Sequence, residues 1–296
     1  MKPAPFQYIA PRTLTEALEV MGHHGADAKL LAGGQSLISV MNFRLAQPAV
    51  LVDLNKLTEL GQLDVSGDGG LRIGAMVRHS QLEHSDLVAQ RAPLVHEAMP
   101  LIAHPQIRTR GTIGGSLAHA DPAAELPVAM VALQARFLLR QSGLERWVAA
   151  EAFFQALFTT ALEPDEILVA IDIPPLARRS GYAFIEVARR HGDYAQAGAA
   201  AVIALDESGI CRQARLVYLN LGEIPMVAGE AAAALVGHRP AAERIDEVAR
   251  HAARHEVEPV ADIHATADYR RHLAYVLGKR ALALAVARAR EGWSLE

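Results

Sequence analysis

Two pairs of adjacent glycines stand in matching surroundings in this sequence. The first lies within residues 32–36 (Ala-Gly-Gly-Gln-Ser) and the second within residues 112–116 (Thr-Ile-Gly-Gly-Ser). Adjacent glycines let the backbone adopt conformations that other residues avoid, and they let another group approach closely. Their amide hydrogens can then converge on an anion. Two such segments therefore predict opposite walls of a site for a cofactor that contains a diphosphate.

The first pair has a plainer interpretation, in which it only turns a strand into a helix. The side chains of Gln35 and Ser36 argue against this, because they add hydrogen-bond donors where the backbone amides point. No lysine follows at the spacing of a nucleoside-triphosphate loop. The Gly-x-Gly-x-x-Gly fingerprint of the standard dinucleotide fold is absent as well.

Charged residues near the second pair leave alternatives open. Arg108 and Arg110 are either surface charges or groups that neutralise a phosphate or an acidic partner. Glu125 is either an acceptor for ribose or ribityl hydroxyls or a common carboxylate at a helix start. Asp121, followed by Pro122, could be only a helix N-cap before a proline at the first helical position.

The remaining residue types suggest no catalytic centre and no metal centre. The sequence shows no Ser–His–Asp, Cys–His or paired-carboxylate signature. His251 and His255 are four residues apart and could face the same way on a helix, but no third ligand is evident. We therefore predict no catalytic residue and no metal ligand in this chain.

Composition excludes several classes of protein. The chain has 296 residues and is 51% hydrophobic, which suits two or three compact domains. A formal net charge of -4 argues against binding to nucleic acid or to acidic lipid. Its single cysteine, Cys211, cannot form an internal disulfide or hold an iron–sulfur cluster alone. We expect a cytoplasmic protein without a signal peptide or a membrane span.

Hydrophobic patterns predict the elements that position the two glycine pairs. Around the first pair we expect a strand at 29–32, a helix at 36–43 and a strand at 49–54. Residues 67–70 (Gly-Asp-Gly-Gly) predict a hairpin turn before a strand at 71–76. Residues 79–98 predict two helical stretches broken at Pro93.

The rest of the chain predicts a mixed second unit and a separate C-terminal domain. We expect strands at 136–140 and 166–173 and a helix at 150–158. Beyond residue 180 the patterns predict an antiparallel meander with strands at 182–188, 198–205 and 213–221. Alanine-rich helices are expected at 229–236, 241–255 and 268–290.

Three segments together resemble the FAD-binding medium subunits of molybdenum hydroxylases. They are residues 32–37 (AGGQSL), 110–116 (RGTIGGS) and 120–127 (ADPAAELP). This family includes carbon monoxide dehydrogenase, nicotine dehydrogenase and the flavin portion of xanthine dehydrogenase. The resemblance continues through residues 165–168 and 173–174, Phe184, and residues 188–190 and 192–195, so it spans essentially the whole chain.

The resemblance implies an α+β fold with three domains. Residues 1–56 and 57–176 would form the two subdomains of a vanillyl-alcohol oxidase-like FAD-binding fold. Residues 177–296 would form a small C-terminal α+β domain.

The resemblance also implies which residues bind FAD. The wall around the diphosphate would comprise Lys29, Leu30, Leu31, Ala32, Gly33, Gly34, Gln35, Ser36 and Leu37. The second subdomain would contribute Thr112, Gly114, Gly115 and Ser116, together with the acidic residues Asp121 and Glu125. Ile102 and Leu168 would pack near the flavin or the adenine, and Tyr194 would lie close to the isoalloxazine ring.

The implied function is electron transfer. Partner subunits would carry the molybdopterin and two [2Fe–2S] clusters, and this chain would pass electrons through FAD to an external acceptor. A dimer of heterotrimers would be the active unit. Two other classes stay open at this point: a nucleotide-binding module without redox activity, and a self-sufficient flavoprotein oxidase.

Overall fold

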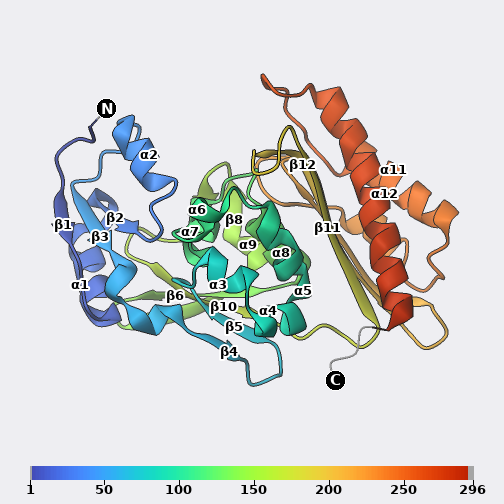
Figure 1. The fold of residues 1–296 in the computed structure, drawn as a ribbon, viewed down its shortest axis with the longest axis horizontal. Coiled ribbons are helices and arrows are strands. Elements are labelled where there is room, and N and C mark those ends of the chain that lie inside the picture. Colours follow the sequence, from blue (N-terminus) through green and yellow to red (C-terminus); the bar gives the residue numbers. More distant parts are fainter. Residues whose placement is uncertain (1, 293–296) are drawn as a thin grey trace.

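The computed structural model describes residues 2–292 and places three β-sheets one after another along the chain. Figure 1 shows the first sheet at one end of the molecule, the second in the middle and the third beside the long C-terminal helices. We call the parts built around these sheets the first, second and third regions.

The first region is a small parallel sheet in the order β1-β3-β2. Its elements are β1 (Gln7–Ile9), α1 (Leu14–His24), β2 (Ala28–Leu31), α2 (Leu37–Asn42) and β3 (Val50–Asp53). Helix α1 begins where the side chain of Thr13 accepts a hydrogen bond from the amide of Glu16 at 3.2 Å. It buries Leu14, Ala17, Leu18 and Met21, which form one helical face.

The second region is an antiparallel sheet in the order β4-β5-β10-β6-β7. Its strands are β4 (Leu63–Val65), β5 (Leu71–Gly74), β6 (Arg136–Gln141), β7 (Leu144–Ala149) and β10 (Ile167–Ile173). Its helices are α3 (His79–Glu83), α4 (Asp86–Arg91), α5 (Pro93–Ala98), α6 (Pro105–Arg108), α7 (Ile113–His119), α8 (Glu125–Ala132) and α9 (Ala150–Phe153). A separate two-stranded ribbon pairs β8 (Phe154–Ala156) with β9 (Thr159–Thr160).

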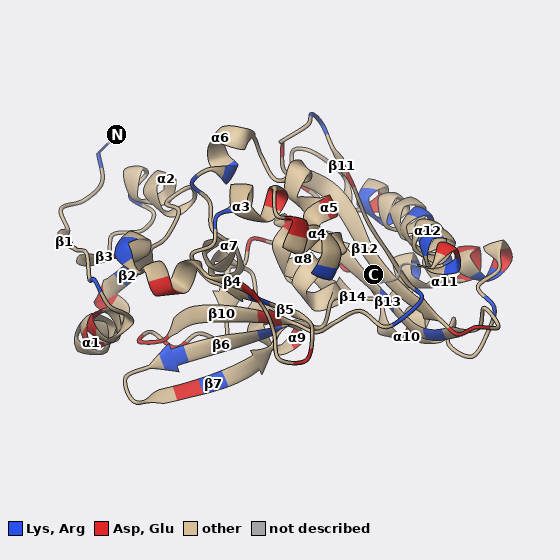
Figure 2. Ribbon diagram, turned by 60° about the horizontal axis from the view of Figure 1, so that its bottom comes forward, with Lys and Arg blue, Asp and Glu red and all other residues tan. Residues whose placement is uncertain are grey.

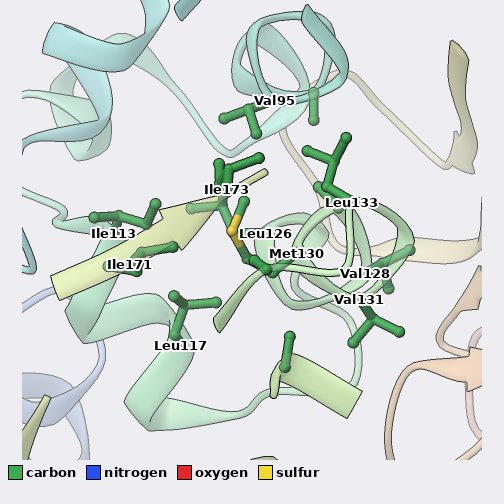
Figure 3. Packing of buried hydrophobic residues seen from close by; sticks show 14 of the residues in the cluster. Val95, Ile113, Leu117, Leu126, Val128, Met130, Val131, Leu133, Ile171 and Ile173 are labelled. Atoms are coloured by element: carbon green, nitrogen blue, oxygen red, sulfur yellow. The ribbon is translucent and has the colours of Figure 1, made fainter. Parts of the chain in front are cut away.

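The core of the second region explains why α7 and α8 lie where they do. Figure 3 shows Ile171 and Ile173 of β10 among Ile113 and Leu117 of α7 and residues of α8. Every residue of α8 is buried, because this helix lies between the central sheet and the strands β12 and β13 of the third region. The second glycine pair is thus attached directly to the main core.

The third region is an antiparallel sheet in the order β11-β12-β13-β14, covered on one face by helices. Its strands are β11 (Ser180–Ala188), β12 (Ala195–Leu205), β13 (Cys211–Leu219) and β14 (Met226–Val227). Its helices are α10 (Gly229–Ala233), α11 (Ala242–His255) and α12 (Ala267–Glu291). Figure 2 shows acidic and basic residues interspersed along α11 and α12, which is typical of solvated helix faces.

Strand β12 separates two hydrophobic cores. Ala200 and Val202 belong to the core of the second region, whereas Ala199, Ala201 and Ile203 face α11 and α12. This division follows from the alternation of side chains along a strand. The ion pair between Arg288 of α12 and Glu97 of α5, at 2.6 Å, also joins the third region to the second.

The predicted meander, the hairpin turn at 67–70 and the three C-terminal helices are confirmed. Two expectations need correction, and several short strands, among them β1, β4, β7 and β14, were not predicted. Residues 79–98 form three helices rather than two, because Ser85 caps α4 and Pro93 begins α5. The helix expected at 150–158 ends at Phe153, because Phe154 pairs with Thr160 in the ribbon.

Candidate functional site

The first glycine pair forms a loop between β2 and α2 that requires glycine at two positions. Gly34 has φ of +75°, a left-handed conformation that favours glycine. At Gly33 a Cβ atom would lie 2.5 Å from the carbonyl oxygen of Arg110 and 2.8 Å from Cα of Gly111. The loop therefore touches the segment that leads into the second glycine pair, and only glycine permits the contact.

The backbone amides of residues 33–37 form a row of free donors. No carbonyl or side chain within residues 2–292 accepts a hydrogen bond from any of them. Gln35 donates its side-chain amide back to the carbonyl of Gly33 at 3.1 Å, so the side chain belongs to the loop itself. A row of unpaired amides strongly favours the binding of an anion with several acceptor oxygens.

The second glycine pair differs, and the expectation that its amides are free is wrong. Thr112 caps α7 and accepts from the amide of Gly115 at 3.2 Å, and its carbonyl accepts from Ser116 at 3.1 Å. The amide of Gly114 donates to the carbonyl of Ala75 at 2.9 Å. These glycines lie in the first turn of α7. Their amides already donate to the capping residue Thr112 and to Ala75, which follows β5.

Small size is what the second pair contributes. A Cβ atom on Gly114 would lie 2.5 Å from Cβ of Ala75, so glycine lets α7 pack against the chain after β5. A Cβ atom on Gly115 would lie 3.4 Å from Cβ of Ala32. The two glycine segments are therefore neighbours in space, as the sequence predicted.

Two acidic residues follow α7. Asp121 accepts from the amide of Ala123 at 2.9 Å in a turn, so it is not the N-cap of a helix, as one alternative held. Glu125 is the first residue of α8 and is only 7% exposed. Burial raises the pKa of Glu125 to about 7, and the negative charge of Asp121 adds to the rise.

A third carboxylate, Glu186 of β11, was missed by sequence reasoning. Its Oε2 atom is buried, and no residue within 2–292 donates a hydrogen bond to it. Burial raises the pKa of Glu186 to about 8, and the charge of Glu125 raises it further. The charge of Glu125 acts on Glu186, so β11 and α8 bring into one neighbourhood two acids that stand far apart in the sequence.

These two carboxyl groups favour hydroxyl donors. Because burial raises the pKa of Glu125 to about 7 and that of Glu186 to about 8, each carboxyl is partly or largely protonated near neutral pH. One carboxyl can then donate a hydrogen bond while the other accepts. Such a wall suits the hydroxyls of a polyol chain, and it repels a free phosphate.

Tyr194 lies beside the acidic residues. Its side chain is 73% exposed, and it follows Gly192, whose φ is +87° and whose Cα packs against the ring of His104. Although the residue is exposed, desolvation of its hydroxyl raises the pKa of Tyr194, and the charges of Asp121 and Glu125 contribute to the rise. The exposed ring is thus available to another flat group.

The other expected site residues fall into two sets. Lys29, Leu30 and Leu31 lie on β2, with the lysine side chain exposed and the leucines half-buried. Ile102, which follows a 3₁₀ turn, and Leu168 of β10 are buried in the core of the second region. Their burial explains why they are apolar and leaves their contact with a ligand as an expectation.

These residues fit FAD in their chemistry. The free amides of 33–37 match the diphosphate, the partly protonated Glu125 and Glu186 match the ribityl hydroxyls, and Tyr194 offers a face to a flat ring. Within residues 2–292 no three His, Cys, Asp or Glu side chains are placed to hold a metal ion. None of the helices in this part of the chain is long and apolar enough to span a membrane.

Comparison with known protein families gives two matches. Residues 4–176 match the FAD binding domain in molybdopterin dehydrogenase. Residues 182–285 match the CO dehydrogenase flavoprotein C-terminal domain. Together the two matches cover most of the chain.

Individual proteins show the same similarity over their full length. The chain is 41% identical to the 6-hydroxypseudooxynicotine dehydrogenase complex subunit alpha of Paenarthrobacter nicotinovorans, over 98% of this chain and 97% of that one. It is 38% identical to the carbon monoxide dehydrogenase medium chain of Hydrogenophaga pseudoflava, over 97% and 99%.

Solved structures agree. A chain of the Hydrogenophaga pseudoflava carbon monoxide dehydrogenase that lacks the Mo-pyranopterin moiety superposes with a TM-score of 0.94, at 39% identity, over 97% of this chain and 99% of that one. A chain of quinoline 2-oxidoreductase from Pseudomonas putida 86 gives a TM-score of 0.92, at 37% identity, over 98% and 99%.

Proposed function

Since this chain belongs to the family of FAD-binding medium subunits of molybdenum hydroxylases, we propose that it holds FAD against the amides of residues 33–37. The chain is the flavoprotein subunit of an oxidoreductase. When bound, FAD takes up electrons delivered by partner subunits and passes them to an external acceptor. The observation that carries the proposal is the row of amides without acceptors in the first loop.

Each wall of the site has its own task toward the cofactor. Residues 29–37 wrap the diphosphate, and residues 33–37 bind it through their backbone amides. Thr112, Gly114, Gly115 and Ser116 contribute from the second region, and a Cβ atom on Gly115 would lie 3.4 Å from Cβ of Ala32 in this loop. Asp121 and Glu125 bind hydroxyls, Ile102 and Leu168 pack near the rings, and Tyr194 covers the isoalloxazine.

The domain boundaries are part of the same proposal. Residues 1–56 and 57–176 are the two FAD-binding subdomains, and 177–296 is the C-terminal domain. In support, the first two sheets use residues up to Asp53 and up to Ile173, and the third begins at Ser180.

The assembly follows from what this chain lacks and what its relatives are called. One cysteine cannot ligate iron–sulfur clusters, so these belong to another chain. The relatives named medium chains imply a large and a small partner, and we assign the molybdopterin to the large one and the [2Fe–2S] clusters to the small one. We further propose a cytoplasmic dimer of heterotrimers.

Flavin content of the purified chain tests the proposal. Gly34→Val places a branched side chain where φ is +75° and where even a Cβ atom lies 3.2 Å from Cγ1 of Ile38. We expect the flavin absorbance to be lost while the far-UV circular dichroism is kept. Gly61→Val is the matched control, because nothing lies within 4 Å of a Cβ atom there. Full flavin content in Gly34→Val would refute the assignment.

A further inference from the structure

A chain of hydrogen bonds joins the first region to the second behind the free amides. Asn55, which follows β3, donates from Nδ2 to the carbonyl of Ala32 at 3.0 Å. Its backbone amide donates to Oδ1 of Asp53 at 2.9 Å, and its side chain donates to the same atom. The hydroxyl of Tyr8 donates to Oδ2 of Asp53 at 2.5 Å.

These contacts fix the orientation of the Asn55 amide group. Burial alone would raise the pKa of Asp53, but the hydrogen bonds from Tyr8 and Asn55 lower it. Asp53 is therefore ionised at neutral pH and accepts from Nδ2 of Asn55. The carbonyl oxygen of Asn55 must consequently point the other way, toward the second region.

Arg78 forms a hydrogen bond with that oxygen. It stands between β5 and α3 and pairs with Thr112, the residue that caps α7. Its Nη2 atom donates to Oδ1 of Asn55, and its Nη1 atom donates to the carbonyl of Arg110. Partial burial and the charge of Arg110 lower the pKa of Arg78, so the guanidinium is held at an unfavourable place by its hydrogen bonds.

Both ends of this chain of hydrogen bonds lie at the first glycine loop. The carbonyl of Ala32 directly precedes Gly33. The carbonyl of Arg110 is the atom that a Cβ on Gly33 would meet at 2.5 Å. Asn55 and Arg78 thus clamp the start of the free-amide row to the second region.

We propose that Asn55 and Arg78 are positioning residues for the diphosphate of the cofactor, which they serve by holding the amides of 33–37 at a fixed distance from the second region. This inference rests on the proposed function. Donors that are held in place before binding lose less conformational entropy when the ligand arrives, so the clamp increases affinity without touching the ligand.

Two simpler roles predict different behaviour. If Arg78 only attracted the diphosphate by its charge, Arg78→Lys would keep the affinity for FAD. If Arg78 acts as a clamp, Arg78→Lys loses affinity, because lysine lacks the planar guanidinium that reaches two acceptors. If the clamp only stabilised the fold, every loss of affinity would be matched by a loss of apoprotein stability.

The experiment uses the full-length chain stripped of its flavin. FAD affinity is measured by flavin fluorescence, the bound flavin by its visible circular dichroism, and the apoprotein by thermal unfolding. The variants are Asn55→Ala, Arg78→Met, Arg78→Lys and the double variant. Arg91→Met is the control, because Arg91 donates to the carbonyl of Gly69 at 2.8 Å within the second region and away from the loop.

We expect each clamp variant to weaken FAD binding by about 10- to 100-fold. Lysine at position 78 should restore little of the affinity, and the double variant should be no weaker than the weaker single variant, since both break one chain. The apoprotein should unfold at the temperature of the Arg91→Met control, and the visible circular dichroism of any bound flavin should change.

Several results would overturn the proposal. They are wild-type affinity in Asn55→Ala or Arg78→Met, full rescue by lysine, additive losses in the double variant, or losses that track apoprotein stability. If Arg78→Met does not fold, Asn55→Ala decides, because Asn55 is exposed and its truncation removes no packed side chain. Failure of the unaltered chain to bind FAD would instead count against the proposed function.

Discussion

The two glycine pairs look alike in sequence and act differently in the structure. At the first pair, the amides of residues 33–37 have no acceptor within the described residues. At the second, Thr112 and Ala75 take the amides of Gly115 and Gly114. Glycine is needed for an exposed, left-handed loop in one place and for close packing of a helix in the other. A shared motif therefore does not imply a shared way of contacting a ligand.

The comparison extends to the groups that each wall leaves unpaired. The first wall presents donors, whereas the wall that follows α7 presents the acids Glu125 and Glu186. Donors suit phosphate oxygens, and a protonated acid pair suits hydroxyls. The site is thus polarised along its length, as a nucleotide with a charged bridge and a polyol chain requires.

The largest expected effect breaks the second glycine pair. In Gly114→Val the new side chain overlaps Ala75, because its Cβ atom would lie 2.5 Å from Cβ and 2.7 Å from the carbonyl oxygen of that residue. Helix α7 would have to leave the core, at a cost of about 3 kcal/mol or more. Urea unfolding of the apoprotein measures this loss. An unfolding free energy within error of the unaltered chain would mean that the packing role is misassigned.

A smaller effect on stability and a larger one on binding are expected at the first pair. Gly33→Ala pushes the loop away from the backbone of Arg110 and Gly111, but its single methyl group displaces less than the valine side chain of Gly114→Val. We expect a stability loss of about 1 kcal/mol together with at least tenfold weaker FAD binding. Urea unfolding and flavin fluorescence on the same sample give both values. If stability fell as far as in Gly114→Val, the contrast between the pairs would disappear.

The smallest effect concerns the acid pair and depends on pH. Because the pKa of Glu186 rises from about 4.5 in the unfolded chain to about 8 in the folded one, the folded apoprotein binds the extra proton. The destabilisation that Glu186 causes is therefore absent below pH 4.5 and grows as pH rises toward 8.

Glu186→Gln removes this contribution. We expect the apoprotein to gain about 1 kcal/mol or less at pH 8, after allowance for solvent screening, and almost nothing at pH 4.5. Thermal unfolding across this pH range measures the slope. The exposed Glu19 of α1 provides a control as Glu19→Gln, which should leave the slope unchanged. A variant with the same pH slope as the unaltered chain would show that Glu186 is not desolvated.

Several parts of the fold could be read from local patterns. The meander of the third region was predictable because its strands are long and follow one another directly. The strand β1 was missed because three residues carry too little periodicity. The short helix α9 was overextended because Phe153 and Phe154 are both apolar, and only the pairing of Phe154 with Thr160 ends it.

The residues of the candidate site also fall into those that the sequence could predict and those that it could not. Its glycines and Glu125 stand in motifs that a reader of the sequence can find. Glu186, Asn55 and Arg78 stand in no motif, and each becomes significant through a neighbour that is distant in the chain. Glu186 is visible only beside Glu125, and Arg78 only between Asn55 and Arg110.

The sequence by itself determined the order of the elements, the two glycine segments and the kinship with FAD-binding subunits, because these depend on residue types at short spacing. The tertiary structure decided which amides are free, which acids are desolvated and which side chains join the two walls. These properties arise from desolvation and from hydrogen bonds between segments far apart in the chain, and neither is encoded at any single position.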